Sequence, residues 1–370
     1  MKVLLVFGTR PEAIKMCPLI LELKESPLIQ TVVCLTGQHR EMLFPVMHTF
    51  NITEDYNLDI MRANQSLTTI TTSILEKFEH ILVNEIPDIV LVHGDTSTSF
   101  AAALASFYQK IPVGHVEAGL RTYNKYSPYP EEMNRRLTGD VSEFHFAPTI
   151  TNKKNLLKEG ITKNIFVTGN TVIDAFKTTV KRNYIFKNQI LSGIDFSKKI
   201  VLVTAHRREN IGRPLENICR ALIRISNTYN DAIIIYPVHL NPAIKNSVNA
   251  ILGNKDRIYL LDPIDVEDMH NIMARSYLVM TDSGGLQEES PSFGIPVLVM
   301  RTETERTEAL KAGTVKLVGI EEDNIFKYAK LLFDNKSKYK KMASAKNPYG
   351  DGYASKRIVK ILIDKFYKGE

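Results

Sequence analysis

The sequence predicts an α/β protein built from two doubly wound, parallel-sheet domains. Apolar strand-like runs alternate with helical-looking segments through the first half of the chain, which is the pattern of a parallel sheet covered by helices. The same alternation restarts at residues 199–204, after a stretch of different character. A length of 370 residues also favours two domains of ordinary size, each able to bury its own core.

The predicted strands are apolar runs separated by helical segments such as residues 67–84. In the first half they cover residues 3–6, 31–35, 88–92, 113–116, 144–147 and 165–167. In the second half they cover residues 199–204, 232–236, 258–261, 278–281 and 296–299. We place the hinge within residues 169–199. We therefore expect a first domain over 1–170, a second over 171–352, and a final helical segment at 353–370.

The composition excludes several classes of protein. The net charge of +6 is spread along the chain without a block of like charges, which speaks against a nucleic-acid-binding surface. No segment approaches the roughly 20 consecutive apolar residues that span a membrane. The three cysteines have no metal-ligand spacing and are best explained as reduced thiols of a cytosolic protein. We expect a cytoplasmic protein that binds neither nucleic acid nor a membrane.

The most informative motif is Phe-Gly-Thr-Arg-Pro-Glu-Ala-Ile-Lys-Met at residues 7–16, directly after an apolar strand. A helix is predicted to begin at Pro11, where the missing N–H of proline costs nothing. Arg10 and Lys15 lie at this junction, where free backbone N–H groups and the helix dipole favour an anion. The motif indicates a seat for a phosphate-bearing ligand. The competing interpretation is an ordinary turn with both cations in solvent.

Carboxylates follow the next strands of the first half. Asp95 comes after strand 88–92, and Glu117 comes directly after strand 113–116. A polar loop then leads to Glu131 in the run 129–136. Ligands of open α/β sheets bind outside the carboxyl ends of the strands, so these side chains are candidate site residues. The structural alternative, that Asp95 and Glu131 only cap helices, stays open at this point.

The second half repeats this arrangement. Ser283, Gly284 and Gly285 follow strand 278–281, and two glycines allow a backbone to approach a diphosphate closely. His206 begins the run His-Arg-Arg-Glu-Asn after strand 199–204, and such cations suit phosphate oxygens. A flexible turn and a structural histidine are the competing interpretations of these two segments.

Taken together, the motifs resemble those of the non-hydrolysing UDP-N-acetylglucosamine 2-epimerases. The matching stretches run in order along essentially the whole chain: FGTRPEAIKM, VHGDTSTSFA, PVGHVEAGLRT, YPEEMNRRLTG, FVTGNTVIDA, TAHRREN, YPVHLNP, TDSGGLQEE and NPYGDG. The resemblance implies two Rossmann-like domains that face each other across a cleft, as in GT-B glycosyltransferases. It also implies that the carboxy-terminal segment crosses back onto the first domain.

The activity that the resemblance implies is reversible C2 epimerisation of UDP-N-acetylglucosamine to UDP-N-acetylmannosamine. In the family, UDP leaves by anti elimination to give 2-acetamidoglucal and then adds back after protonation on the opposite face. Asp95, Glu117 and Glu131 match the catalytic carboxylates of the family. By the same resemblance His206 contacts the diphosphate and supports departure of UDP, and the product supplies N-acetylmannosamine for bacterial surface polysaccharide.

The resemblance also implies binding residues and partners. The expected substrate-binding set is Arg10, Lys15, His206, Ser283, Gly284, Gly285, Glu289 and Arg306. A second, activating UDP-N-acetylglucosamine would contact Gln38, Glu41, Arg207 and His239, and the family suggests a homodimer. Neither a metal nor a cofactor is expected, because the chain has no HExxH or CxxC pattern and its first turn lacks GxGxxG.

Other functions stay open from the sequence. A related 2-acetamido UDP-sugar, hydrolysis to free N-acetylmannosamine and UDP, a GT-B glycosyltransferase and a binding regulator without turnover are the alternatives. The Asp95–Glu117–Glu131 set speaks against the transferase and the regulator. The loop 290–307 departs from the family pattern at several positions, which leaves the choice of sugar open.

Overall fold

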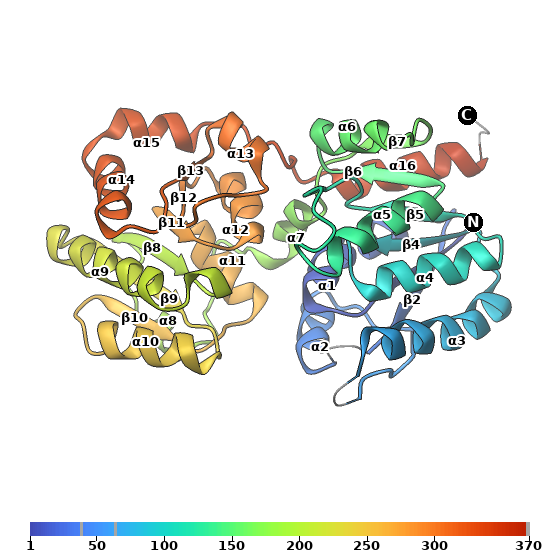
Figure 1. Cartoon of the computed structure of the whole chain (residues 1–370), viewed down its shortest axis with the longest axis horizontal. Coiled ribbons are helices and arrows are strands. Elements are labelled where there is room, and N and C mark those ends of the chain that lie inside the picture. Colours follow the sequence, from blue (N-terminus) through green and yellow to red (C-terminus); the bar gives the residue numbers. More distant parts are fainter. Residues whose placement is uncertain (38–39, 63–64, 368–370) are drawn as a thin grey trace. The chain divides into compact units, whose positions relative to one another are not determined.

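The computed structural model describes residues 1–37, 40–62 and 65–367 of the chain (Figure 1). It divides into two compact units, Met1–Thr178 with Tyr349–Glu370, and Thr179–Pro348. The chain therefore leaves the first unit after Thr178 and re-enters it at Tyr349. The expected boundaries, after residues 170 and 352, fall a few residues away from these points, so most of the helix Val172–Thr179 belongs with the first unit.

Within the described residues, the first unit holds a seven-stranded sheet in the order β3-β2-β1-β4-β5-β6-β7. The strands are β1 Lys2–Phe7, β2 Gln30–Leu35, β3 Tyr56–Asn57, β4 Ile89–His93, β5 Val113–Val116, β6 Phe144–Ala147 and β7 Ile165–Val167. All neighbouring pairs are parallel. Only the two-residue β3 was not predicted, because it is too short to leave an apolar pattern.

Helices cover both faces of this sheet. They are α1 Arg10–Lys24, α2 Arg40–Thr49, α3 Leu67–Glu85, α4 Ser97–Tyr108, α5 Glu131–Val141, α6 Ile150–Lys158, α7 Val172–Thr179 and α16 Ala354–Tyr367. Helices α3 and α4 lie side by side (Figure 1), and with Leu4 and Val6 of β1 they enclose one hydrophobic core. Leu5 and Phe7 alternate to the opposite face and are also fully buried.

The second unit has the same architecture with a six-stranded sheet among its described residues, in the order β10-β9-β8-β11-β12-β13. The strands are β8 Lys199–Thr204, β9 Ala232–Pro237, β10 Ile258–Leu261, β11 Leu278–Thr281, β12 Val297–Val299 and β13 Val315–Leu317. The larger helices are α9 Arg213–Thr228, α10 Pro242–Leu252, α11 Val266–Ala274, α14 Glu322–Asp334 and α15 Lys336–Ala343. The short ones are α8 Gln189–Ser192, α12 Gly284–Glu289 and α13 Thr307–Ala312. The predicted fold class of two doubly wound parallel sheets is confirmed.

Each sheet has a switch point, where the strand order reverses direction. In the first unit it lies between β1 and β4, and in the second between β8 and β11. At such a point the connections leave toward opposite faces, which opens a crevice at the carboxyl ends of the strands where ligands bind. The candidate residues Arg10 and Asp95 follow β1 and β4, and His206 and Ser283 follow β8 and β11.

The last helix returns to the first unit. Helix α16 packs against α1, and its first backbone N–H groups donate to Asp174 of α7, from Ala354 at 3.1 Å and from Ser355 at 2.9 Å. At the other end, the Tyr367 hydroxyl donates to the Leu28 carbonyl at 2.6 Å. None of the helices in the described part of the chain is long and apolar enough to span a membrane.

The glycine after β5 has no room for a side chain. Gly119 has φ of +89°, and a Cβ atom there would lie 2.3 Å from the Asn152 carbonyl oxygen. Gly160 is the matched control, because its φ is +86° and nothing lies within 4 Å of its Cβ position. Both alanine substitutions incur left-handed strain of about 1–2 kcal/mol.

We expect Gly119→Ala to lower the free energy of unfolding by about 1–3 kcal/mol more than Gly160→Ala, since only the former also clashes with backbone. Urea unfolding of both variants, followed by circular dichroism, measures the difference. Equal losses would show that the Asn152 segment moves aside freely.

Candidate active site

The turn after β1 is organised by a buried carboxylate that the sequence analysis did not single out. Glu12 is 2% exposed, and its Oε2 accepts the backbone N–H groups of Gly8 at 3.0 Å and Thr9 at 2.8 Å. Its Oε1 accepts the hydroxyls of Thr96 at 2.6 Å and Ser99 at 3.1 Å. Burial raises the pKa of Glu12, and these hydrogen bonds oppose the shift. Glu12 thus joins the loops that follow β1 and β4.

The sequence did contain a signal for Glu12. Thr9 caps α1, and Glu12 is the third residue after it, so the two form a capping box. The structure begins α1 at Arg10, with Pro11 in the first turn, close to the predicted start. Arg10 itself is half-buried at this end of the helix.

Glu117 is the centre of a cluster in the first unit. It lies directly after β5 in the left-handed region, with φ of +64°. Its carboxylate forms an ion pair with Lys15 and accepts the Asn170 Nδ2–H at 2.9 Å. The His93 Nε2 atom lies 3.7 Å from the same oxygen. Lys15 therefore pairs with a candidate catalytic carboxylate. Only 16% of its side chain is exposed, so it is not a solvated surface cation.

Three buried histidines lie in neighbouring strands beneath this cluster. His93 is in β4, His115 in β5 and His145 in β6, and the last two are direct cross-strand partners. Burial lowers the pKa of His93 to about 4, of His115 to about 3 and of His145 to about 4. The His115 Nε2–H donates to the Gly94 carbonyl at 2.7 Å, next to Asp95. These rings are neutral at neutral pH.

Helix α5 holds the loop that carries Asp95. Arg135 forms an ion pair with the Asp95 carboxylate, and the Asn134 Nδ2–H donates to the Asp95 carbonyl at 2.9 Å. Arg135 also lies 3.3 Å from Glu132. Glu131 is the first residue of α5, and its Oε2 is buried without a hydrogen-bond partner among the described residues. Arg135 and Asn134 were missed, although the motif 129–136 contains both.

In the second unit, a buried aspartate holds the loop after β8. Asp282 is fully buried, and its Oδ2 accepts the N–H groups of His206 at 2.8 Å and Arg207 at 2.9 Å. The same oxygen accepts the Asn210 Nδ2–H at 2.9 Å. Asp282 was not predicted, although its place between a buried strand and a Ser-Gly-Gly turn was a usable signal.

His206 is the more exposed partner of this aspartate. Its Nδ1 lies 3.4 Å from Asp282 Oδ1, and its ring stacks on His239 with centroids 5.8 Å apart. Burial lowers the pKa of His206, while Asp282 opposes the shift. Because 41% of the side chain is exposed, the imidazole can reach a ligand.

The two glycines after Ser283 make room for charged side chains. A Cβ on Gly284 would lie 2.9 Å from Cζ of Arg306, and one on Gly285 would lie 3.0 Å from Oε1 of Glu289. Both side chains therefore lie directly against the backbone of the turn. Helix α12 is short and is followed by the 3₁₀ turn Ser290–Phe293.

The predicted ribose-binding residue Glu289 is held in the second unit. Its carboxylate lies 3.4 Å from the Nε2 atom of His270. The other ring nitrogen of His270 is 2.8 Å from the Thr179 hydroxyl, at the start of the unit. Only 13% of the Glu289 side chain is exposed, so its position is defined by protein contacts.

An arginine cluster surrounds Glu305 in the second unit. Arg306 lies 2.7 Å from Glu305 and 2.8 Å from Glu288, and Arg207 and Arg301 also pair with Glu305. Burial alone would raise the pKa of Glu305, but the three arginines outweigh it and lower this pKa to about 2.

Two of the four residues expected to bind an activator, Arg207 and His239, have described side chains in the second unit. The Arg207 Nε–H donates to the Asp282 carbonyl at 2.9 Å, and His239 stacks on His206. Gln38 and the side chain of Glu41 lie outside the described residues.

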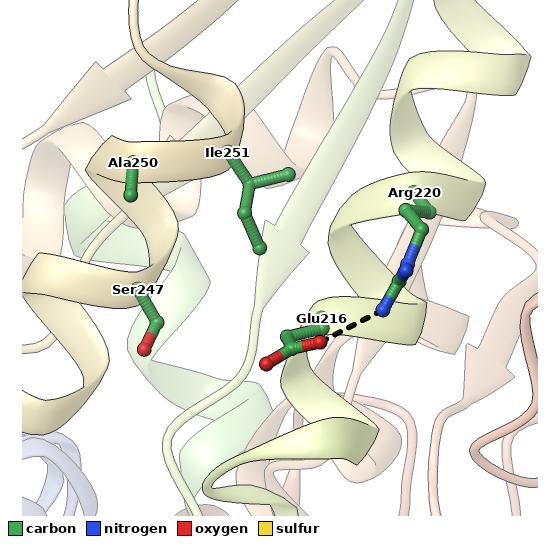
Figure 2. Close-up of a pocket in the computed structure, with 5 residues that line it drawn as sticks. All are labelled: Glu216, Arg220, Ser247, Ala250 and Ile251. Carbon is green, nitrogen blue, oxygen red and sulfur yellow. Dashed lines mark hydrogen bonds and ion pairs between the residues drawn. The ribbon is translucent and has the colours of Figure 1, made fainter.

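A separate pocket of about 350 Å³ lies between α9 and α10 (Figure 2). It is lined by Glu216, Arg220, Ser247, Ala250 and Ile251, with Glu216 and Arg220 paired at 2.8 Å. Among the described residues, none of those predicted to form the site lines this pocket.

Two doubly wound sheets, each with charged side chains gathered at its switch point, define a GT-B-like protein. A glycosyltransferase of kitacinnamycin, only 10% identical, shares this fold with a TM-score of 0.66 over 98% of each chain. The family model for UDP-N-acetylglucosamine 2-epimerase matches residues 21–363, and the chain belongs to this family. The resemblance inferred from the motifs is thereby confirmed.

Individual relatives agree with this assignment. The UDP-N-acetylglucosamine 2-epimerase of Bacillus subtilis (strain 168) is 52% identical over 364 residues, covering 98% of this chain and 95% of the relative. The crystal structure of UDP-GlcNAc 2-epimerase from Neisseria meningitidis bound to UDP-GlcNAc is 50% identical. It superposes with a TM-score of 0.90 and covers 98% of this chain and all of that one.

The buried histidines make stability depend on pH. Their pKa values near 3 to 4 lie below the value of about 6.5 expected in the unfolded chain. Between these values the unfolded chain binds more protons, so the free energy of unfolding falls as the pH is lowered from about 7 to about 5.

We expect His145→Gln to make this pH dependence shallower by up to about 1.4 kcal/mol per pH unit, because one titrating group is removed. Urea unfolding at several pH values measures the slope. Thr31→Val in β2 is the control, since it replaces a buried hydroxyl that does not titrate. An unchanged slope in His145→Gln would show that this ring titrates with the same pKa in the folded and the unfolded chain.

Proposed function

We propose that the protein interconverts UDP-N-acetylglucosamine and UDP-N-acetylmannosamine by inversion at C2. The observation that carries this proposal is the environment of Glu117. This carboxylate is held by Lys15 and Asn170 at the carboxyl ends of the first sheet, in a chain of the 2-epimerase family. The related Neisseria meningitidis structure with bound UDP-GlcNAc supports the choice of substrate.

The chemistry requires acid/base groups and a retained leaving group. No carbonyl acidifies the C2 proton, so simple deprotonation and reprotonation at C2 does not suffice. In the proposed cycle a carboxylate takes the C2 proton, and the C2–H electrons form the C1=C2 double bond. The C1–O bond breaks with its electron pair going to UDP, which leaves 2-acetamidoglucal. Protonation of C2 on the opposite face and return of the UDP oxygen to C1 complete the inversion.

We assign the proton transfers to the first unit. Asp95, Glu117 and Glu131 are the proposed acid/base residues. Arg135 and Lys15 pair with the first two, which keeps a counter-charge beside each carboxylate. The Oε2 atom of Glu131 is buried without a hydrogen-bond partner in the described part of the chain, which supports its use toward a ligand because a buried polar atom without a partner is costly.

We assign UDP binding to the second unit, and Arg10 is the proposed substrate-binding arginine of the first unit. The Ser283–Gly285 turn lets phosphate oxygens approach the backbone, and Glu289 accepts the ribose hydroxyls. Arg306 and His206 are the proposed partners of the diphosphate. His206, with its lowered pKa and partial exposure, is suited to stabilise UDP as it departs.

Three further elements of the proposal rest on the family resemblance. A second UDP-N-acetylglucosamine acts as activator at Arg207 and His239, together with Gln38 and Glu41. The protein acts as a homodimer. Its product supplies N-acetylmannosamine for surface polysaccharide.

The direct test is proton NMR of the purified protein with UDP-N-acetylglucosamine in D2O. We expect a manno-configured UDP-sugar that carries deuterium at C2, because the C2 proton exchanges with solvent during the cycle. Free N-acetylmannosamine with UDP would reassign the protein to the hydrolysing branch. Bound but unaltered UDP-N-acetylglucosamine would indicate a different 2-acetamido sugar or a glycosyltransferase.

Two substitutions separate chemistry from nucleotide binding. We expect Glu117→Gln to abolish deuterium exchange while the affinity for UDP, measured by calorimetry, stays within about twofold of the wild type. Glu289→Gln should instead weaken UDP binding by about tenfold, the effect of one lost hydrogen bond to a charged group.

The exposed Glu321, which precedes α14, provides the control variant Glu321→Gln, expected to alter neither property. Undiminished exchange in Glu117→Gln would remove this carboxylate from the mechanism, and unaltered UDP affinity in Glu289→Gln would place the ribose elsewhere.

A further inference from the structure

The two connections between the units lie side by side where they meet the first unit. The outgoing segment follows β7 and leaves after Thr178, and the returning segment enters at Tyr349. Gly169 of the outgoing segment and Gly350 of the returning segment lie opposite each other, with φ of +92° and +137°. A Cβ on Gly169 would lie 3.4 Å from the Gly350 Cα. The two backbones therefore lie close together, and the positive φ angles at both positions favour glycine.

Further contacts join these segments along their length. The Arg357 guanidinium donates to the Thr168 carbonyl at 2.9 Å. The Lys177 ammonium lies 4.2 Å from the centroid of the Tyr353 ring. Together with the hydrogen bonds from the start of α16 to Asp174, these contacts make the paired connections a single structural element of the first unit.

Asn170 lies in this element and contacts three different segments. Its backbone N–H donates to the Tyr349 carbonyl at 2.6 Å, and its Oδ1 accepts the Val172 N–H at 3.1 Å. Its Nδ2–H donates to the Glu117 carboxylate at 2.9 Å. The residue is 3% exposed, so its short side chain is held rigidly by packing.

Two other described groups near Glu117 are less able than Asn170 to orient its carboxylate. Lys15 of α1 approaches on a flexible four-carbon stem, and an ammonium is a point charge with little directional preference. His93 of β4 lies at 3.7 Å, which is beyond hydrogen-bond distance. The amide of Asn170 is the rigid, directional donor in this set.

We propose that Asn170 is a positioning residue that sets the orientation of the Glu117 carboxylate from the paired connections between the two units. The inference rests on the proposed function, in which Glu117 exchanges a proton with C2 of the sugar. It adds that an acid/base group is held by the segment through which the units are joined. A change in the backbone of that segment would therefore alter the orientation of the Glu117 carboxylate through the side chain of Asn170.

The sharpest test is Asn170→Asp, which is nearly isosteric. The new carboxylate can still accept the Val172 N–H, and the backbone bond to Tyr349 is untouched, so of these three hydrogen bonds only the donation to Glu117 is lost. We expect kcat to fall by about tenfold to a hundredfold, the scale of a hydrogen bond to a charged group, while KM changes by less than about threefold. The buried second carboxylate should lower thermal stability, so kcat is measured well below the melting temperature of the variant.

A second readout does not depend on turnover. Carbon-13 NMR of labelled glutamate carboxyl groups follows the titration of Glu117, whose signal is identified by its loss in Glu117→Gln. We expect its pKa to rise in Asn170→Asp, because a like charge replaces a donor, and to rise less in Asn170→Ala, which removes the donor only. The pH profile of kcat should move in the same direction.

Asn164→Asp is the chemically matched control, since Asn164 donates to Glu143 at 3.2 Å away from this cluster. It should leave kcat and the Glu117 titration unchanged. Wild-type kcat and an unmoved Glu117 pKa in Asn170→Asp would overturn the proposal. So would a loss of kcat with the Glu117 pKa unmoved. If the wild type itself fails to epimerise, the proposed function fails, while the titration still tests the role of Asn170.

Discussion

The structure depends on a buried carboxylate at each switch point. Strands β1 and β4 send their connections to opposite faces of the first sheet, and Glu12 accepts hydrogen bonds from both of the loops that follow them. Strands β8 and β11 diverge in the same way, and Asp282, at the end of β11, accepts the N–H groups of the loop after β8. In both units an unfavourable burial of charge is offset by several hydrogen bonds.

These carboxylates explain why the candidate side chains have defined positions. A loop that ended freely at a sheet edge would leave its N–H groups to water and its side chains mobile. The hydrogen bonds to Glu12 and Asp282 fix these loops at the ends of the sheets. Asp95 and His206, which the loops carry, are therefore held in defined positions. The left-handed conformation of Glu117 is a further sign of this constraint, because non-glycine residues in that region cost about 1–3 kcal/mol and persist only where the surroundings enforce them.

Much of this arrangement could be predicted from the sequence, because strand ends and turns are local patterns. Buried apolar runs located all the longer strands, and the motifs placed Asp95, Glu117 and Ser283 after them. The partners of these residues could not be predicted in the same way. Asn170 reaches Glu117 across 53 residues of chain, and Asp282 reaches His206 across 76, so their roles exist only in the folded state. β3 was missed because two residues carry no periodic signal, and β13 was missed because Lys316 interrupts its short apolar run.

The two units differ in how their charges respond to pH. The arginine cluster of the second unit keeps its charge at all ordinary pH values, and the pKa of Glu305 near 2 means that its counter-charge is equally permanent. Under the proposed function, such fixed charge suits a diphosphate that is held throughout the reaction. The first unit instead gathers carboxylates, which can exchange protons, over histidines that burial keeps neutral. Histidines with such low pKa values are weak bases, so under the proposed function proton exchange in this unit falls to the carboxylates. Nucleotide binding in the other unit would then be independent of that exchange.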